Sequence, residues 1–343
     1  MKKTVLGLVL CLLFVTLTGC GSTKADNFQT WTKDAAAIQA LETYVAAVTD
    51  EKSEDFIPVA DRIACFDLDG TLFCETFPIY GEWLLFAERA LNDPTYEAPD
   101  DIREVAETVV AAGESRSIPE GLEEAEINAQ AKAFAGMSIE DYTAYVKEFM
   151  QTEAEGFNNL KRGEAYYKPM LEIVTYLQEN DFTVYICSGT NRFTVRALID
   201  GTIDIPERQV IGSDFTMTAT GQGETGDMHY SIAVEDELLM GDELIIKNVK
   251  TSKVFQIKQE LAQKPVLVFG NSSGDIPMAL YSDTENPYPT EVFFLLCDDL
   301  EREHGNVEKA DGIRETCGEY GWNTISMRDD WVTIYGDDVT ITK

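Results

Sequence analysis

The sequence is poor in basic residues and in histidine. It contains 27 lysines and arginines against 61 aspartates and glutamates, so the formal net charge of the 343-residue chain is −34. A surface of that charge repels the phosphate backbones of nucleic acids, and we therefore expect no nucleic-acid binding. The only two histidines, His229 and His304, fall in none of the motifs described below, and we expect both at the surface.

Cysteine is present but lacks the spacing of a structural site. Beyond residue 20 the chain has five cysteines and no Cys-x-x-Cys pair. An odd number without that spacing is typical of neither a disulfide framework nor a zinc site. Cys65, Cys187 and Cys297 lie in apolar runs, which predicts buried free thiols.

Long hydrophobic runs are also missing. The apolar run at residues 5–15 is too short to span a membrane. It follows Lys2 and Lys3 and ends near small residues, as in a secretory signal. The sequence Leu17-Thr18-Gly19-Cys20 resembles the lipobox of bacterial lipoproteins. That resemblance implies a signal peptide at residues 1–20, lipidation of Cys20, and an exported envelope protein held to the membrane by its N-terminal lipid alone. The alternative is an ordinary signal peptide with a chance cysteine.

The pattern of apolar residues beyond the polar tether at 21–31 indicates an α/β fold. Strand-like runs alternate with amphipathic helices, which is typical of a doubly wound, mostly parallel sheet of the Rossmann-like kind. The expected strands are 63–66, 182–187, 210–212, 266–269 and 293–296, with antiparallel strands within 215–246. The expected helices are 32–49, 169–179, 192–199 and 253–261.

Residues 78–165 interrupt this pattern because they contain no convincing strand. Their apolar spacing predicts helices at 81–91, 100–112, 122–135 and 138–152. We therefore predict an α/β core made of residues 32–77 and 166–343, with an all-helical cap domain at 78–165 inserted into it.

Polar side chains follow three of the predicted strands. Asp67 and Asp69 follow the first, Ser188 the second, and Asn271 with Asp275 the strand at 266–269. In doubly wound sheets, functional groups gather beyond the carboxyl ends of the strands. Two acids at the end of an apolar strand are costly to bury unless a cation compensates them, and a divalent metal is the usual solution. The alternative for Asp69 and Ser188 is helix capping.

Taken together, these segments resemble a phosphatase of the haloacid dehalogenase superfamily. Asp67-Leu68-Asp69-Gly70-Thr71 is similar to its first motif and Cys187-Ser188-Gly189 to its second; a lysine opening a helix, Lys253, matches the third, and Gly270-Asn271-Ser272-Ser273-Gly274-Asp275 the fourth. The similarity is closest to the phosphoserine-phosphatase-like branch with a helical cap, including exported and phosphocholine-phosphatase-like members. Asn271 departs from the aspartate that is commoner at its position.

The resemblance implies a role for each of these residues. Asp67 is expected to attack phosphorus and form an aspartyl-phosphate, and Asp69 to act as general acid and base. Mg²⁺ is expected as cofactor, held by Asp67, Asp69, Asn271 and Asp275, with Asp275 alternatively orienting the lysine. Ser188, the Gly189 amide and Lys253 are expected to bind the phosphate. Lys250 and Lys247 remain alternatives to Lys253.

The implied function is a magnesium-dependent phosphatase outside the cytoplasm that hydrolyses small organic phosphomonoesters. A phosphotransferase or mutase of the same superfamily uses the same chemistry with another acceptor. A dehalogenase would use Asp67 alone. The presence of Asp69 argues against that alternative, since an acid at this position serves an oxygen leaving group. A non-catalytic ligand-binding lipoprotein is the alternative of a different class.

Overall fold

The computed structural model describes residues 27–75 and 77–342. The predicted signal peptide, Cys20 and most of the tether therefore lie outside the described residues. Within the described part of the chain, no helix is both long enough and apolar enough to cross a membrane.

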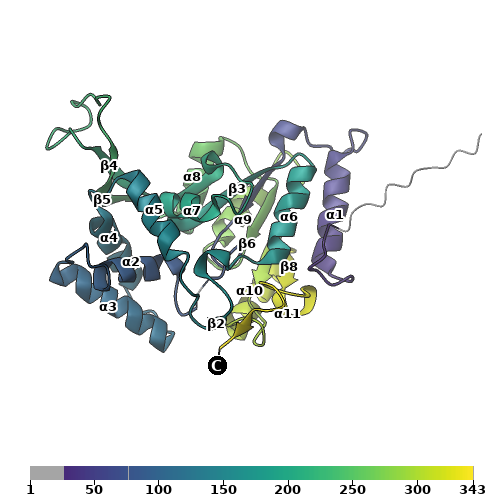
Figure 1. Cartoon of the computed structure of the whole chain (residues 1–343). Helices are drawn as coiled ribbons and strands as arrows, with labels where there is room; N and C mark the ends of the chain where they lie inside the picture. The colour runs from purple at the N-terminus through teal and green to yellow at the C-terminus, as the bar shows by residue number, and fades with distance from the viewer. Residues whose placement is uncertain (1–26, 76, 343) are drawn as a thin grey trace, which may run out of the picture.

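A seven-stranded sheet forms the centre of the molecule (Figure 1). Its strand order is β5-β4-β3-β1-β6-β7-β8, and every neighbouring pair is parallel except β4 and β5, which form an antiparallel hairpin. The predicted fold class, a doubly wound and mostly parallel α/β sheet, is confirmed. The strands are β1 (Ile63–Phe66), β3 (Thr183–Asn191), β4 (Val210–Ala219), β5 (Leu238–Ile246), β6 (Leu267–Gly270), β7 (Glu291–Leu296) and β8 (Asn323–Ser326).

Helices cover both faces of the sheet because successive strand residues point to opposite sides. In β1, Ala64 and Phe66 join one hydrophobic core, whereas Ile63 and Cys65 join the other. The first core also receives α1 (Ala36–Thr49), α6 (Lys168–Glu179) and α7 (Arg192–Ile199). The second receives α8 (Thr251–Leu261), α9 (Ile276–Asp283) and α10 (Val307–Tyr320).

Four helices between β1 and α6 form a separate group beside the hairpin (Figure 1). They are α2 (Gly81–Leu91), α3 (Asp100–Ser115), α4 (Leu122–Phe134) and α5 (Ile139–Phe149), and we call them the cap helices. α4 packs against β5, and α5 packs against α7. Two main-chain hydrogen bonds also join this group to β5: the Gly136 amide donates to the Met240 carbonyl, and the Met240 amide to the Met137 carbonyl, both at 2.8 Å.

Several predictions about secondary structure were incomplete. The segment 78–165 does contain a two-residue strand, β2 (Phe157–Asn158), because it pairs with β9 (Thr340–Ile341) near the C-terminus. The strand predicted at 182–187 continues as β3 through the whole polar segment 188–191. The strand predicted at 210–212 runs on into the hairpin. The sequence pattern predicted none of α9, α10 and β8. It also missed α11 (Met327–Asp330) and single helical turns at Val59–Asp61, Arg162–Glu164 and Glu207–Gln209.

Two side chains also differ from their expected burial. Cys297 is half-buried rather than buried, because β7 ends at Leu296, just before it. His304 is half-buried rather than at the surface, because its ring stacks on Phe77 and its Nε2 lies 2.8 Å from the Gly156 carbonyl. All five described cysteines are free thiols, with Cys65 and Cys187 buried as predicted.

Stacked aromatic rings connect three adjacent strands of the sheet. The Phe66 and Phe269 ring centroids lie 4.1 Å apart, and those of Phe269 and Phe293 lie 5.0 Å apart. We predict that Phe293→Ala lowers the free energy of unfolding by about 3–5 kcal/mol, since it leaves a cavity in this stack. Phe255→Ala on α8 is the matched control, because Phe255 is 57% exposed, and it should change stability by no more than about 0.5 kcal/mol. Urea unfolding of both variants measures the difference, and equal effects would contradict the assigned role of the stack.

Candidate active site

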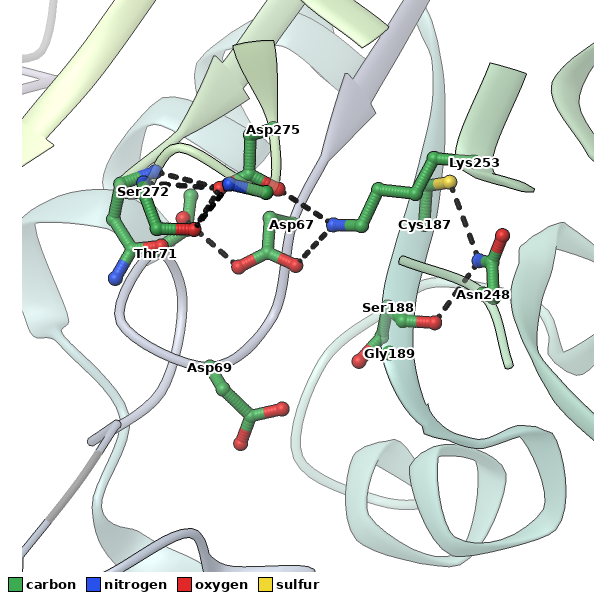
Figure 2. A network of polar contacts seen from close by, with 12 residues as sticks. Asp67, Asp69, Thr71, Cys187, Ser188, Gly189, Asn248, Lys253, Ser272 and Asp275 are labelled. Atoms are coloured by element: carbon green, nitrogen blue, oxygen red, sulfur yellow. Dashed lines mark hydrogen bonds and ion pairs between the residues drawn. The ribbon is translucent and has the colours of Figure 1, made fainter. Parts of the chain in front are cut away.

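The polar residues predicted from the strand ends meet at one edge of the sheet (Figure 2). Asp67 directly follows β1, and Asn271 directly follows β6, the neighbouring parallel strand. A cavity of about 170 Å³ lies at this edge, and its walls include Asp67, Asp69 and Gly189. A wider cleft of about 700 Å³ adjoins it and is lined by residues from α3 and α10.

Asp67 is buried and paired with Lys253. Its Oδ1 lies 2.5 Å from the Lys253 ammonium, while its Oδ2 accepts only a long hydrogen bond, 3.4 Å, from the Thr71 hydroxyl. The Asp67 amide donates to the Phe269 carbonyl at 2.9 Å, which continues the pairing of β1 with β6. Asp67 also lines the cavity, so its carboxylate is held firmly at one oxygen and only weakly at the other.

The Lys253 ammonium is shared between two carboxylates. It also lies 2.7 Å from Asp275 Oδ1, as Figure 2 shows. These two carboxylates lower the cost of burying the ammonium and hold the pKa of Lys253 above its usual value, and Lys253 in turn lowers the pKa of Asp275. Burial, together with the negative charge of Asp275, raises the pKa of Asp67, and the Lys253 ammonium opposes this shift. The single positive charge of Lys253 thus faces the two carboxylates of Asp67 and Asp275, and the three side chains together carry surplus negative charge.

Asp275 also organises the loop after β6. Its Oδ2 accepts three hydrogen bonds of 3.1 Å, from the Asn271 amide, the Ser272 amide and the Ser272 hydroxyl. A Cβ atom on Gly270 would lie 2.6 Å from the Asp275 Cβ, so the close approach of these two backbones requires glycine there. Asp275 therefore orients Lys253 and shapes the loop; the prediction that it also contributes to a metal site stays a prediction.

Asp69 lies across the cavity from Lys253. Its Oδ2 accepts a hydrogen bond of 2.8 Å from the Thr190 hydroxyl. Burial raises the pKa of Asp69 to about 6, an effect that this hydrogen bond partly opposes. Its carboxyl group is thus fixed on the β3 side of the site, separate from the Asp67–Lys253–Asp275 group.

Gly70, which follows Asp69, permits a tight turn against Asn271. It has a φ of +84°, and a Cβ placed on it would lie 1.8 Å from Asn271 Nδ2. Both the left-handed backbone and the contact exclude any larger residue. The glycine of the first motif is therefore explained by the packing of the first and fourth motifs against each other.

Two of the three predicted phosphate-binding residues, Ser188 and Gly189, lie in a bulge of β3, and the third, Lys253, lies on α8. Gly189 lines the cavity, whereas Ser188 is fully buried, and its hydroxyl accepts a hydrogen bond of 3.0 Å from the Thr190 amide. The Ser188 hydroxyl hydrogen is left to donate. Of the three lysines considered, Lys253 contacts Asp67, Lys247 lines the cavity, and Lys250 is exposed beside the wider cleft.

The oxygen atoms around Asp67 suit a hard divalent cation. Within the described residues, neither the Asn271 amide oxygen nor the Asp69 carbonyl accepts a hydrogen bond, and Asn271 Nδ2 is buried without a partner. Carboxylate, amide and carbonyl oxygens are the ligands that Mg²⁺ prefers. The described residues contain no cluster of three or more His, Cys, Asp or Glu side chains of the kind that holds a metal. The ligands that fit Mg²⁺ here are therefore a carboxylate, a side-chain amide oxygen and a main-chain carbonyl, rather than a cluster of acidic side chains.

Several residues of the cavity were not predicted from the sequence. Thr190 was visible as the neighbour of Ser188 and Gly189, but its contact with Asp69 was not. Glu82 of α2 is buried, lines the cavity, and accepts a hydrogen bond of 2.7 Å from the Asn191 amide. Tyr80 and Trp83 line the same cap side. As aromatic residues at helical spacing they were expected mainly in the core, with the lining of a pocket as the alternative. Only tertiary packing brings Thr190 and Glu82 to the site, and no local sequence signal marks their contacts.

Comparisons with known proteins agree with this arrangement. A family model described as haloacid dehalogenase-like hydrolase matches residues 64–280, more than half of the chain. No curated protein matches the chain. The fold is similar to that of a conserved, functionally unknown protein from Anaerococcus prevotii DSM 20548, with a TM-score of 0.54 and 15% identity, covering 87% of this chain and 92% of that chain.

Two other solved structures match with lower TM-scores. One is a phosphoserine phosphohydrolase-like protein from Francisella tularensis subsp. tularensis SCHU S4, with a TM-score of 0.41, 14% identity, and coverage of 74% of this chain and 92% of that chain. The other is cytosolic 5'-nucleotidase IIIB bound to cytidine, with a TM-score of 0.48, 11% identity, and 89% coverage of each chain. Neither is close enough to carry an argument about this site.

The contact between Gly70 and Asn271 generates a prediction about stability. Gly70→Ala should lower the free energy of unfolding by about 3 kcal/mol or more, because it combines a left-handed backbone with a clash. Gly201→Ala is the control, since Gly201 has a φ of +73° but nothing within 4 Å of its Cβ position; it should cost only about 1–2 kcal/mol. Denaturant unfolding compares the two, and equal losses would mean that Asn271 yields without cost.

Proposed function

The chain belongs to the haloacid dehalogenase-like hydrolase family, and we propose that it is a magnesium-dependent phosphatase that hydrolyses small organic phosphomonoesters through an aspartyl-phosphate on Asp67. The observation that carries the proposal is the orientation of Asp67, which lines the cavity, has one oxygen held by Lys253 and has the other in only a long contact with Thr71. A carboxylate oriented in this way is a nucleophile suited to forming a covalent intermediate.

In the first step, Asp67 attacks phosphorus and the ester oxygen leaves. The residues that fit Mg²⁺ are Asp67, Asn271 and the Asp69 carbonyl, and the bound metal supplies charge that offsets the repulsion between carboxylate and phosphate. Lys253 adds positive charge beside the attacking carboxylate. The Gly189 amide and the Ser188 hydroxyl are assigned to the phosphate oxygens.

Asp69 is assigned the proton transfers. It lies across the cavity from Lys253, and Thr190 holds one of its carboxyl oxygens at 2.8 Å. In its protonated form it gives a proton to the departing alkoxide; as a carboxylate it then takes one from the water that hydrolyses the aspartyl-phosphate. The same residue thus serves both halves of the reaction. If an acceptor alcohol replaced this water, the enzyme would be a phosphotransferase, and the products of the reaction distinguish the two.

We also propose that the protein acts outside the cytoplasm, attached by lipid at Cys20. The support is the Leu17-Thr18-Gly19-Cys20 sequence after a short apolar run. Mass spectrometry of the mature N-terminus tests this part of the proposal, and an unmodified N-terminus at another residue would contradict it.

We predict that Asp67→Asn abolishes hydrolysis of an aryl phosphate in the presence of Mg²⁺, because an amide cannot form the phosphoenzyme. Asp61→Asn is the matched control. Asp61 lies near the opposite end of β1 and accepts a hydrogen bond from the Tyr288 hydroxyl. The control should keep wild-type activity, and release of inorganic phosphate measures both variants. Substantial activity in folded Asp67→Asn protein would overturn the assignment of Asp67.

A second prediction concerns the amide in the metal site. Asn271→Asp should lower the Mg²⁺ concentration required for half-maximal activity and for thermal stabilisation about fivefold, since the added charge contributes on the order of 1 kcal/mol in a partly solvated site. Turnover should slow, because the same charge opposes the incoming phosphate. Asn286→Asp makes the same charge change in the segment between α9 and β7 and should leave the Mg²⁺ dependence unchanged. An unchanged or weaker Mg²⁺ dependence in Asn271→Asp would remove Asn271 from the metal ligands.

A further inference from the structure

In the β3 bulge, residues 188–190, two main-chain carbonyls accept hydrogen bonds from side chains outside the strand. The Ser188 carbonyl accepts a hydrogen bond of 2.9 Å from Asn248 Nδ2, and the Gly189 carbonyl accepts one of 2.6 Å from the Ser213 hydroxyl. Figure 2 shows the first of these contacts on the side of the segment that faces away from Asp69. Two successive carbonyl groups are therefore bound to groups outside β3.

The bulge arises because β3 and β4 lose their register here. Cys187 pairs with Ile211, but the next pair is Asn191 with Ser213. Between these two pairs the chain runs four residues along β3 but only two along β4. Residues 188–190 are therefore left without regular partners on β4. The hydrogen bonds from Asn248 and Ser213 replace the missing sheet partners.

The direction of these carbonyls sets the direction of the amides. A trans peptide is planar, and its C=O and N–H groups point in opposite directions. Because the Ser188 and Gly189 carbonyls point to Asn248 and Ser213, the Gly189 and Thr190 amides point away from those two residues, and both Gly189 and Thr190 line the cavity. Successive amides that point to one side form a concave site that binds anions. The Thr190 amide already donates to the Ser188 hydroxyl, so the Gly189 amide is the one left for a ligand.

Asn248 is itself held in a single position. It is fully buried; its main-chain amide donates to the Ser213 hydroxyl at 3.0 Å, and its Nδ2 also lies 3.5 Å from the Cys187 sulfur. The same hydroxyl that accepts from Asn248 donates to Gly189, so the two residues form one network. The turn that carries Asn248 is strained: Lys250 has a φ of 52° and a ψ of −124°, and such a backbone persists in a residue other than glycine only where its surroundings impose it.

We propose that Asn248, together with Ser213, is a positioning residue that aims the Gly189 amide at a phosphate oxygen of the substrate. This inference rests on the proposed phosphatase function and extends it to residues that do not line the cavity. Asn248 donates to the carbonyl of the very peptide whose amide binds the phosphate. Loss of that donor frees the peptide to rotate, and the Gly189 amide loses its direction.

The test is Asn248→Asp, which keeps the size of the side chain but replaces the donor with an acceptor that repels the Ser188 carbonyl. Two quantities are measured in the presence of Mg²⁺: the binding of inorganic phosphate, by calorimetry, and the values of kcat and KM for two aryl phosphates with different leaving groups. We expect phosphate affinity to fall about tenfold or more, and KM to rise by a similar factor for both substrates, because the lost contact is made with the phosphate alone.

The matched control is Asn286→Asp. Asn286 Nδ2 also donates to two main-chain carbonyls, those of Pro265 and Ser282, but far along the chain from the site. It should lose stability without a change in phosphate affinity or KM. If Asn248→Asp does not fold, Ser213→Ala decides the question. This variant loses a single hydroxyl, the donor to the Gly189 carbonyl. Its phosphate affinity should fall in the same way.

Two results would overturn the inference. One is unchanged phosphate affinity in the folded variant. The other is a fall in kcat with KM and phosphate affinity unchanged, which would mean that Asn248 supports only the general fold. A wild-type protein that neither binds phosphate nor hydrolyses phosphomonoesters would instead contradict the proposed function itself, so the two failures are distinguishable.

Discussion

The contact of one buried ammonium with two carboxylates holds the catalytic edge of this protein together. Lys253 comes from α8, Asp67 from the end of β1, and Asp275 from the loop after β6. Removing Lys253 would leave two buried carboxylates without a counter-charge, which costs several kcal/mol. The three elements must therefore pack correctly at the same time. Asp275 carries the constraint further, because it also binds the main chain of residues 271 and 272.

The opposite wall of the cavity is built from hydrogen bonds rather than from ion pairs. Thr190 holds Asp69, Asn248 and Ser213 hold the carbonyls of the β3 bulge, and Glu82 accepts from the amide of Asn191 at the start of α7. The site thus combines a charged half, formed by β1, β6 and α8, with a half whose main-chain dipoles are fixed in advance. That division suits a reaction in which a carboxylate attacks an anion, since the charge that develops on the phosphate meets oriented amides.

The sequence predicted the sheet and the position of its functional edge because both depend on local patterns. Apolar runs marked the strands, and polar residues placed directly after them had to meet where parallel strands end. The final helices and strands were harder to predict: α10 buries only Ala310, Ile313 and Cys317, which is a weak periodic signal. The sequence favoured Lys253 over Lys247 and Lys250 because Lys253 opens a predicted helix, but only the direction of α8, which begins at Thr251, shows which ammonium reaches Asp67. Glu82, Asn248 and Ser213 lay beyond sequence reasoning altogether, since each acts through contacts between distant segments.

The hydrogen bonds between the cap helices and β5 limit how substrate reaches the cavity. Residues 136 and 137 are joined to Met240 by two main-chain bonds, β5 pairs with β4, and β4 pairs with the bulged strand that carries Gly189. A rotation of the whole cap would have to break those bonds or shift the β3 bulge. The cap is joined to the core a second time, because α5 packs against α7 and Glu82 of α2 accepts a hydrogen bond from the Asn191 amide. Any opening of the cavity that leaves the β3 bulge in place therefore requires movement of part of the cap rather than of the cap as a whole.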